Sequence, residues 1–216
     1  MHSVTMDTLI ATLLEGDQAG ALEEVRKLLA AGEGRQRIIT DGVEAAMKRL
    51  DAKCTVEQFN LLEIMLSGRA VMGVMKELYP PELLNAPERE TKATIVLGAL
   101  EGDIHDLGKN ILKMVLTASG YRVVDCGKDC PLSDLVDSVR QEKAQALGIS
   151  GLITSIVPLV RQVRGALAEQ KLGHVRVLAG GAALKQATPE DLDVDYVAQT
   201  AFDGLKYLDR MTVVAR

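Results

Sequence analysis

Asp103 and His105 stand two residues apart in the segment "EGDIHDLGKNIL" (101–112), and this pairing suits the binding of a metal. A carboxylate that accepts a hydrogen bond from one ring nitrogen of a histidine orients the ring and leaves the other nitrogen free for a metal. The chain contains only three histidines, so this placement needs a reason. The alternative is a polar loop residue that caps the following helix, and these two residues alone leave that interpretation open.

A zinc site made by protein alone needs three or four ligands. His2 stands at the N-terminus, and His174 precedes the fourth expected strand, at the sheet edge opposite to the one expected for His105. Cys126 and Cys130 follow the second expected strand and could only approach the histidine. The sequence therefore disfavours a protein-only zinc site. A single histidine suffices when a macrocycle fills the other positions of the metal, as in haem and cobalamin.

The residues before about position 80 carry apolar side chains at helical spacing, which predicts four amphipathic helices. Thr55 and Gln58 have capping-box spacing, so we expect the fourth helix to begin at Thr55 and to end at "YPP" (79–81). The four stripes are Met6, Leu9, Ile10, Leu13 and Leu14; Leu22, Val25, Leu28 and Leu29; Ile39, Val43, Ala46, Met47 and Leu50; and Phe59, Leu62, Leu66, Met72 and Met75. Short connections predict an antiparallel four-helix bundle over residues 1–90, with an unstructured linker at 82–92.

From residue 91 onward, strand-like apolar runs alternate with helical segments. The expected strands are "KATIVLGAL" (92–100), "YRVVD" (121–125), "AQALGIS" (144–150), "HVRVLAGG" (174–181) and "VDYVA" (194–198). Alternation of this kind requires a parallel, doubly wound sheet with right-handed crossovers. We therefore predict an α/β, flavodoxin- or Rossmann-like domain over residues 91–216, with five strands in the order 2-1-3-4-5.

Ligands of such sheets bind beyond the carboxyl ends of the strands, near the switch point between the first and third strands. Small and polar residues gather at the ends of the first, third and fourth expected strands, which the topology brings to one edge. They include Gly102, Asp103, His105 and Gly108; Ser150, Gly151 and Thr154; and Gly180, Gly181 and Ala182. Neither G-x-G-x-x-G nor GK[ST] occurs, so a dinucleotide site or a P-loop has little support.

The motif "GDIHDLGKN" resembles the D-x-H-x-x-G motif of cobalamin-binding domains, with Asp103, His105 and Gly108 in the key places. "SGLIT" (150–154) is similar to the S-x-L segment of that family, and "AGGAAL" (179–184) to its closing glycine pair. "DCGKDCP" (125–131) resembles a further family stretch after the second strand. A helical bundle precedes this domain in methionine synthase and in the corrinoid proteins of methyltransferase systems. The resemblance covers nearly the whole chain and is most specific over residues 92–182.

The resemblance implies that His105 is the lower axial ligand of cobalt and that Asp103 orients it and shares its proton. The nucleotide tail of the cofactor would enter a slot beside the third and fourth strands, where two hydroxyls, an apolar wall and two glycines line it. The implied cofactor-binding residues are Gly102, Asp103, Ile104, His105, Asp106, Gly108, Ser150, Leu152, Thr154, Gly180, Gly181 and Ala182, with His105 as the metal ligand.

The implied function is that of a methyl carrier without turnover of its own. Cobalt(I) accepts a methyl group from a substrate-specific methyltransferase and donates it to an acceptor methyltransferase acting on tetrahydrofolate or a thiol, and a reductive activator restores the cobalt. The alternatives are the cobalamin-binding subunit of a mutase and a cobalamin-dependent sensor. A mutase needs a large partner barrel, and a sensor usually needs a DNA-binding module. Methylcobalamin preference would indicate a carrier; adenosylcobalamin preference would indicate a mutase or a light sensor.

The sequence departs from the family pattern in two places. Where the family often has a hydroxyl residue two places beyond Thr154, this chain has Ile156, preceded by Ser155. "AQTA" (198–201) replaces a more acidic pattern after the last strand. In the bundle, the usual aromatic and proline pattern is missing, and Met65, Met72 and Met75 either cover the upper corrin face or belong to the core.

Composition narrows the remaining classes of function. The net charge of -5 is spread without a basic stripe, which disfavours nucleic acid and anionic membranes as partners. No apolar run approaches the roughly 20 residues that span a bilayer. The N-terminus lacks the pattern of a signal peptide, and three cysteines without a CxxC motif are typical of free thiols in a reducing compartment. We therefore expect a cytoplasmic protein.

Overall fold

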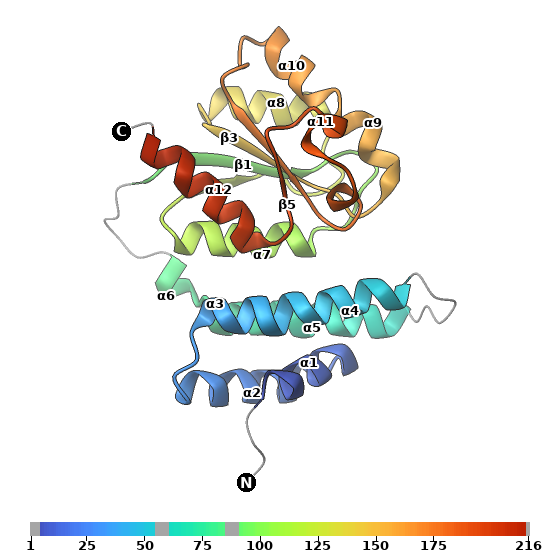
Figure 1. Ribbon diagram of the computed structural model, residues 1–216, viewed down its shortest axis with the longest axis vertical. Helices are drawn as coiled ribbons and strands as arrows, with labels where there is room; N and C mark the ends of the chain where they lie inside the picture. The colour runs from blue at the N-terminus through green and yellow to red at the C-terminus, as the bar shows by residue number, and fades with distance from the viewer. Residues whose placement is uncertain (1–4, 55–60, 85–90, 215–216) are drawn as a thin grey trace. The chain divides into compact units, whose positions relative to one another are not determined.

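The computed structural model describes residues 5–54, 61–84 and 91–214. Its internal contacts divide the chain into two units, Met1–Asn85 and Ala86–Arg216, drawn in Figure 1. The domain boundary predicted at residue 90, like most of the predicted linker, lies outside the described residues. Residues 82–84 are not unstructured as predicted, because they belong to the short helix α6 (Pro81–Leu84). Within the described residues, no helix is both long and apolar enough to cross a membrane.

The first unit is helical, as the periodicity predicts. Its elements are α1 (Met6–Glu15), α2 (Gln18–Ala30), α3 (Arg35–Arg37), the π-helical turn η1 (Ile38–Val43), α4 (Glu44–Cys54), α5 (Leu61–Leu78) and α6. α1 and α2 both pack against α5, and α1 also packs against η1 and α4. Leu9, Val25, Ile39, Val74 and Met75 are fully buried and form part of the core.

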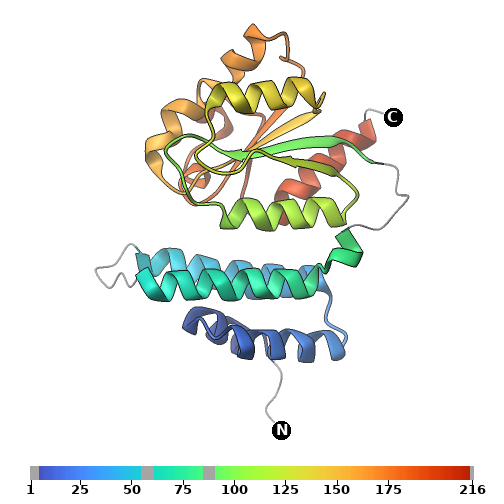
Figure 2. The same ribbon diagram turned by 180° about the vertical axis from the view of Figure 1, so that it is seen from behind.

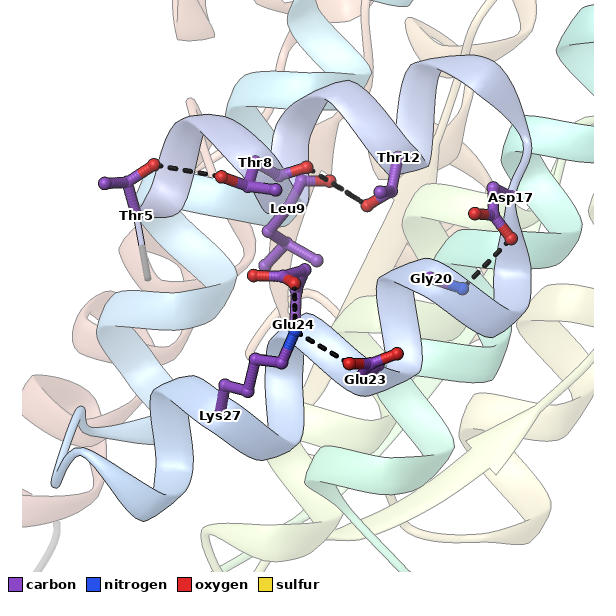
Figure 3. A network of polar contacts seen from close by, with 9 residues as sticks. All are labelled: Thr5, Thr8, Leu9, Thr12, Asp17, Gly20, Glu23, Glu24 and Lys27. Atoms are coloured by element: carbon purple, nitrogen blue, oxygen red, sulfur yellow. Dashed lines mark hydrogen bonds and ion pairs between the residues drawn. The ribbon is translucent and has the colours of Figure 1, made fainter. Parts of the chain in front are cut away.

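Polar contacts fix the ends and outer faces of α1 and α2, as Figure 3 shows. The carboxylate of Asp17 accepts a hydrogen bond from the backbone N–H of Gly20 and so caps the start of α2. Lys27 lies 2.7 Å from Glu23 and 2.8 Å from Glu24, one turn earlier on the same helix. Such ion pairs at a helix surface contribute little to stability. The hydrophobic face therefore supplies most of the stability of this helix pair.

The third predicted helix is not regular, because the π-helical turn η1 interrupts it between α3 and α4. Gly42 lies in this turn, and a Cβ there would stand 2.9 Å from Leu9 Cδ2, so the close approach to α1 depends on glycine. The capping box predicted at Thr55 and Gln58 lies outside the described residues. A local departure such as a π turn carries no periodic signal, which is why the spacing of apolar residues did not reveal it.

Helix α5 also differs from the prediction, because Leu62 and Leu66 are 62% and 37% exposed and do not join the buried stripe. The connection between α1 and α2 meets α5 at Leu66 and Ser67, where Ser67 Oγ donates a hydrogen bond to Leu14 O. From Ser67 to the end of α5, the side chains facing α1 and α2 are buried. Helical spacing alone therefore did not distinguish the exposed start of α5 from its buried remainder.

The second unit contains the predicted parallel sheet, with strand order β2-β1-β3-β4-β5. The strands are β1 (Thr94–Ala99), β2 (Arg122–Asp125), β3 (Ala146–Ser150), β4 (Arg176–Gly180) and β5 (Tyr196–Ala198). The helices are α7 (Leu107–Ala118), α8 (Leu132–Gln141), α9 (Val157–Val160), α10 (Val163–Glu169), α11 (Pro189–Leu192) and α12 (Ala201–Val214), with the 3-10 turns η2 (Thr154–Ile156) and η3 (Leu184–Gln186). The predicted α/β fold class and strand order are confirmed.

Helices cover both faces of the sheet in Figures 1 and 2, with α7 and α12 on one face and α8 and α10 on the other. The central strand β1 is buried on both faces, as its continuous apolar run predicts. Ile95 and Leu97 join the core beneath α7 and α12, whereas Val96 joins the larger core on the opposite face. Register places Ala99, Ser150 and Gly180 side by side at the carboxyl edge.

Candidate functional site

A tight turn after β1 presents the predicted metal-binding segment. Asp103 N donates a hydrogen bond to Leu100 O over 3.0 Å, and Gly102, the third residue of the turn, has φ +91°. This matches a type II turn, in which the third residue needs a positive φ and is therefore usually glycine. Gly102 serves the backbone of the turn, and the turn directs Asp103 into the protein.

Asp103 is fully buried and its carboxylate takes part in three hydrogen bonds. Oδ1 accepts the backbone N–H of His105 over 2.9 Å, and Oδ2 accepts the backbone N–H of Leu152 over 2.7 Å. Burial raises the pKa of Asp103, but the hydrogen bonds from Leu152 and His105 outweigh it and hold the pKa below its ordinary value. The group is therefore an anion at neutral pH.

The imidazole of His105 lies beside this anion, with Nδ1 2.8 Å from Asp103 Oδ1. A carboxylate anion only accepts, so the proton of this contact lies on Nδ1, and in the neutral form of the ring Nε2 keeps its lone pair. The side chain is 48% exposed, and Nε2 has no hydrogen-bond partner within the described part of the chain. Asp106, not His105, is the N-cap residue of α7, and it makes no side-chain cap hydrogen bond. The histidine is thus an oriented base with one open nitrogen, and the helix-capping interpretation is wrong.

Backbone hydrogen bonds join the three predicted loop segments at this edge. Leu152 N binds Asp103, as described above, and Gly151 N donates to Gly180 O over 2.9 Å. Ala183 N donates to Gly151 O over 3.3 Å. Gly181 has φ +104°, and a Cβ there would stand 2.3 Å from Gly151 O. The two segments can therefore meet only because Gly181 has no side chain.

The other predicted residues lie around this meeting point with different exposures. Ile104 and Leu152 are apolar and yet 62% and 39% exposed. Ser150 and Ala182 are half-buried, and Thr154 is exposed at the start of η2. Exposed apolar side chains beside an open imidazole nitrogen suit a flat, partly apolar ligand that would cover them.

The hydroxyl expected in the family beyond Thr154 is absent in structure as well as in sequence. Ile156 is buried, and a Cβ on Gly151 would stand 2.5 Å from its Cδ1, so it fills the core beneath this segment. Ser155 is exposed and is not a partner of Asp103, whose second oxygen binds the Leu152 amide instead. The second oxygen of Asp103 thus pairs with a backbone N–H, which no side-chain type in the sequence signals.

Gly108 differs from the other glycines of the site. It lies in the first turn of α7, is exposed, and a Cβ added to it would meet no atom within 4 Å. The fold itself therefore does not require glycine at this position. Space beside the histidine is what a bulky group held by Nε2 would need, and this open position fits a macrocycle.

The first turn of α7 is tied to the end of β2 by a pair that the sequence did not reveal. Lys109 is 2% exposed, and its Nζ lies 2.6 Å from Asp125 Oδ1. Burial raises the pKa of Asp125, but hydrogen bonds from Lys109, Gly127 and Lys113 outweigh it and lower the pKa overall. From the sequence alone, a lysine directly after the D-x-H-x-x-G motif is expected at the surface. Only the fold shows that Lys109 is buried.

Two cysteines flank the connection between β2 and α8. Cys126 and Cys130 are free thiols that pack in the same hydrophobic cluster as Leu135. Burial raises the pKa of the Cys130 thiol to about 11, and the neighbouring Cys126 and Asp134 contribute less to this shift. Cys130 therefore behaves as an apolar core residue. Within the described residues, no three histidine, cysteine or acidic side chains gather to hold an ion.

Residues with weaker predictions have other roles. Thr200 Oγ1 accepts the backbone N–H of Asp203 and caps α12, and Ala198 lies at the end of β5 beside Gly180. Met75 belongs to the core of the first unit, whereas Met65 is 64% exposed and Met72 half-buried.

Two family models match the chain. One, described as a B12 binding domain, covers residues 93–205, more than half of the chain. A second B12 binding domain model covers residues 5–79. The chain belongs to the B12-binding family. Both the sheet domain that carries His105 and the helices before it are thus recognisable parts of a B12-binding protein.

Relatives of this B12-binding protein are corrinoid proteins. It is 30% identical over 203 residues to monomethylamine corrinoid protein 1 of Methanosarcina barkeri, covering 93% of this chain and 94% of that protein. The solved structure of the monomethylamine corrinoid protein of Methanosarcina barkeri matches with a TM-score of 0.81 at 28% identity, over 93% and 94% of the two chains. A methanol:cobalamin methyltransferase complex of the same organism matches with a TM-score of 0.55 at 25% identity, over 96% of this chain and 79% of that chain.

These similarities confirm the predicted family, the cobalamin cofactor and the methyl-carrier class of corrinoid protein. The donor set fits that cofactor, since one oriented imidazole with a free Nε2 stands beside open space at Gly108 and exposed apolar side chains.

Proposed function

We propose that this protein carries a methyl group between two methyltransferases, with His105 Nε2 as the lower axial ligand of the cobalt of cobalamin. The observation that carries the proposal is the half-exposed imidazole whose other nitrogen is bound to a buried anion. When bound, the corrinoid supplies a nucleophilic cobalt that can take up and release a methyl group. The protein contributes orientation of the ligand, a pocket and surfaces for its partners.

Asp103 has two tasks in this proposal. It keeps the proton on Nδ1, which leaves Nε2 in the form that binds metal. Because its other oxygen is held by Leu152 N, it also ties the histidine to the segment after β3. Movement of that segment would reach His105 through a single buried carboxylate, without the hydroxyl that the family often uses.

The surroundings of the histidine provide the remaining parts of the pocket. We assign Gly108 to give room for the corrin ring, and Ile104 and Leu152 to cover apolar parts of the cofactor. The nucleotide tail would pass beside β3 and β4, where Ser150 and Gly180 are paired in register. Gly102, Asp106, Thr154, Gly181 and Ala182 complete the proposed cofactor-binding set.

Partners and substrates are proposals as well. The similarity to a monomethylamine corrinoid protein makes a methyltransferase acting on methylated amines the first donor partner to test, and the similarity to a methanol complex makes a methanol enzyme the second. We further propose an acceptor methyltransferase that uses tetrahydrofolate or a thiol, and a reductive activator. Free Cys126 and Cys130 agree with a reducing compartment such as the cytoplasm.

We also propose that the helical residues 1–90 act as a cap domain for the cofactor. What supports this is the group of large apolar side chains, Leu62, Met65 and Leu66, that the first half of α5 leaves exposed. An apolar surface of this kind marks an interaction site. Met75 is excluded from that role because it is fully buried in its own unit.

The test is an absorption spectrum of the full chain after incubation with hydroxocobalamin and gel filtration, beside His105→Ala. We expect the wild type to retain corrin bands with a nitrogen axial ligand, and His105→Ala to lose that ligand signature. Added imidazole should restore it in the variant, because it supplies the missing nitrogen. His174→Ala is the control and should match the wild type.

A wild-type protein that elutes without corrin bands would overturn the cofactor assignment for this chain. If cobalamin is retained but His105→Ala has the wild-type spectrum, cobalamin binding stands and the axial role of His105 is wrong.

A further inference from the structure

We propose that Asp129 is a positioning residue for the Asp103–His105 pair, and this inference rests on the proposed axial role of His105. Asp129 lies in the connection between β2 and α8. Its carboxylate Oδ1 accepts the backbone N–H of Gly102 over 2.8 Å, and its own backbone N–H donates to Asp103 O over 2.9 Å. One residue thus binds both ends of the Gly102–Asp103 dipeptide in the turn that carries the buried anion.

The backbone of Asp129 is adapted to this double contact. Its φ is +52°, in the left-handed region that non-glycine residues rarely adopt and that aspartate and asparagine tolerate best. The left-handed conformation turns the backbone N–H and the side chain toward the same dipeptide. A residue that merely ended a strand would not need this combination.

The segment around Asp129 is held firmly to β1 on both sides. Ala99 N donates to Gly127 O over 3.0 Å, and Cys130 N donates to Ala99 O over 2.9 Å. Glu101 N donates to Cys130 O over 2.9 Å. Asp129 therefore stands on a fixed support, and its contacts with the turn can define where the turn lies.

The consequence for the histidine follows from the contacts already described. Asp103 is held at its carbonyl oxygen by Asp129 and at its carboxylate by Leu152. The other carboxylate oxygen, Oδ1, accepts hydrogen bonds from both His105 N and His105 Nδ1. A shift of the Asp103 backbone would tilt the imidazole, and a metal ligand displaced by a fraction of an ångström binds less well.

The experiment compares Asp129→Gly with Lys143→Gly. Lys143 also has a left-handed backbone, with φ +51°, but it lies in the turn between α8 and β3. Both variants replace a left-handed residue by glycine, and only the first removes the acceptor of the Gly102 N–H. The readouts are the fraction of bound cobalt with a nitrogen axial ligand, the affinity for hydroxocobalamin, and the melting curve of the cofactor-free protein.

We expect Asp129→Gly to reduce the nitrogen-ligand fraction and to weaken cobalamin binding about 10-fold, as is usual for partners that orient a metal ligand. Lys143→Gly should match the wild type in both readouts. Asp129→Asn should also match it, because an amide oxygen can accept the same N–H and asparagine tolerates the left-handed region.

An Asp129→Gly protein with the wild-type spectrum and affinity would overturn the inference, and so would a loss that merely follows the unfolded fraction. If Asp129→Asn fails as Asp129→Gly does, the hydrogen bond is not the cause and the inference is also wrong. The His105→Ala variant distinguishes failure of this inference from failure of the proposed function. If His105→Ala loses the nitrogen ligand and Asp129→Gly has no effect, only the positioning role of Asp129 is overturned. If the wild type shows no nitrogen ligand, both are overturned.

Discussion

Asp103, which is buried, and Asp195, whose side chain is 13% exposed, are carboxylates at opposite edges of the same sheet, and they differ in their partners. Asp103, at the carboxyl edge, accepts from Leu152 N and from His105. Asp195, at the amino edge just before β5, accepts from Val177 N and lies 2.8 Å from both Arg164 and Arg176.

In both cases burial raises the pKa, and hydrogen bonds from N–H groups lower it by more. The side-chain partners of Asp195 are arginines, which stay charged at all ordinary pH values. The partner of Asp103 is an imidazole whose second nitrogen is open. Similar hydrogen bonding to a carboxylate therefore joins two arginines to the fold at one edge and orients an imidazole at the other.

The largest expected effect is that of Asp103→Asn on the cofactor. A carboxylate offers acceptors on both oxygens, whereas an amide has one accepting oxygen, so either Leu152 N or His105 loses its acceptor. We expect cobalamin affinity to fall about 10- to 100-fold, measured by titration with hydroxocobalamin. Unchanged affinity with a normal axial-ligand spectrum would show that the two aspartates are equivalent structural groups.

Asp195→Asn should instead affect stability and leave cobalamin binding alone. We expect a loss of about 2 kcal/mol in the free energy of unfolding at pH 7. The amide nitrogen that replaces one carboxylate oxygen cannot accept the hydrogen bonds which that oxygen accepted. Urea unfolding measures it. Asp137→Asn is the control, since its pair with Arg140 is exposed and should change stability by less than about 1 kcal/mol.

The Asp195 contribution should depend on pH in a defined direction. Because the folded pKa lies below the unfolded value of about 3.9, the stabilisation is complete above that value and is lost as pH falls through the folded pKa. The difference between wild type and Asp195→Asn should therefore shrink as the pH falls below about 4. A difference that stays constant over this range would show that the charge of Asp195 contributes nothing.

The smallest expected effects distinguish two exposed helical glycines. Gly108 in α7 and Gly165 in α10 both have open space where a Cβ would lie. Alanine at either should raise the free energy of unfolding by about 0.5 kcal/mol through helix propensity. Only Gly108→Ala should weaken cobalamin binding, by about 5-fold, because the added methyl occupies the space proposed for the corrin ring. Equal binding by the two variants would remove Gly108 from the pocket.

Much of this protein follows from its sequence through local rules. Alternating apolar runs and helical stripes predicted the parallel sheet, its strand order and the helices before it, because each element carries its own periodicity. The spacing of Asp103 and His105 predicted that the two side chains meet, since residues two apart in a turn can do so without help from distant segments.

The tertiary structure decided the features that depend on segments distant in sequence. Leu152 contributes a backbone N–H to Asp103, and every residue has such a group, so no residue type could announce it. Lys109 is buried only because Asp125 ends the neighbouring strand. Leu62 and Leu66 share the spacing of core residues but are exposed, whereas Ser67, which contacts Leu14 of α1, is buried. Periodicity defines which side of a helix is apolar, whereas burial depends on what packs against it.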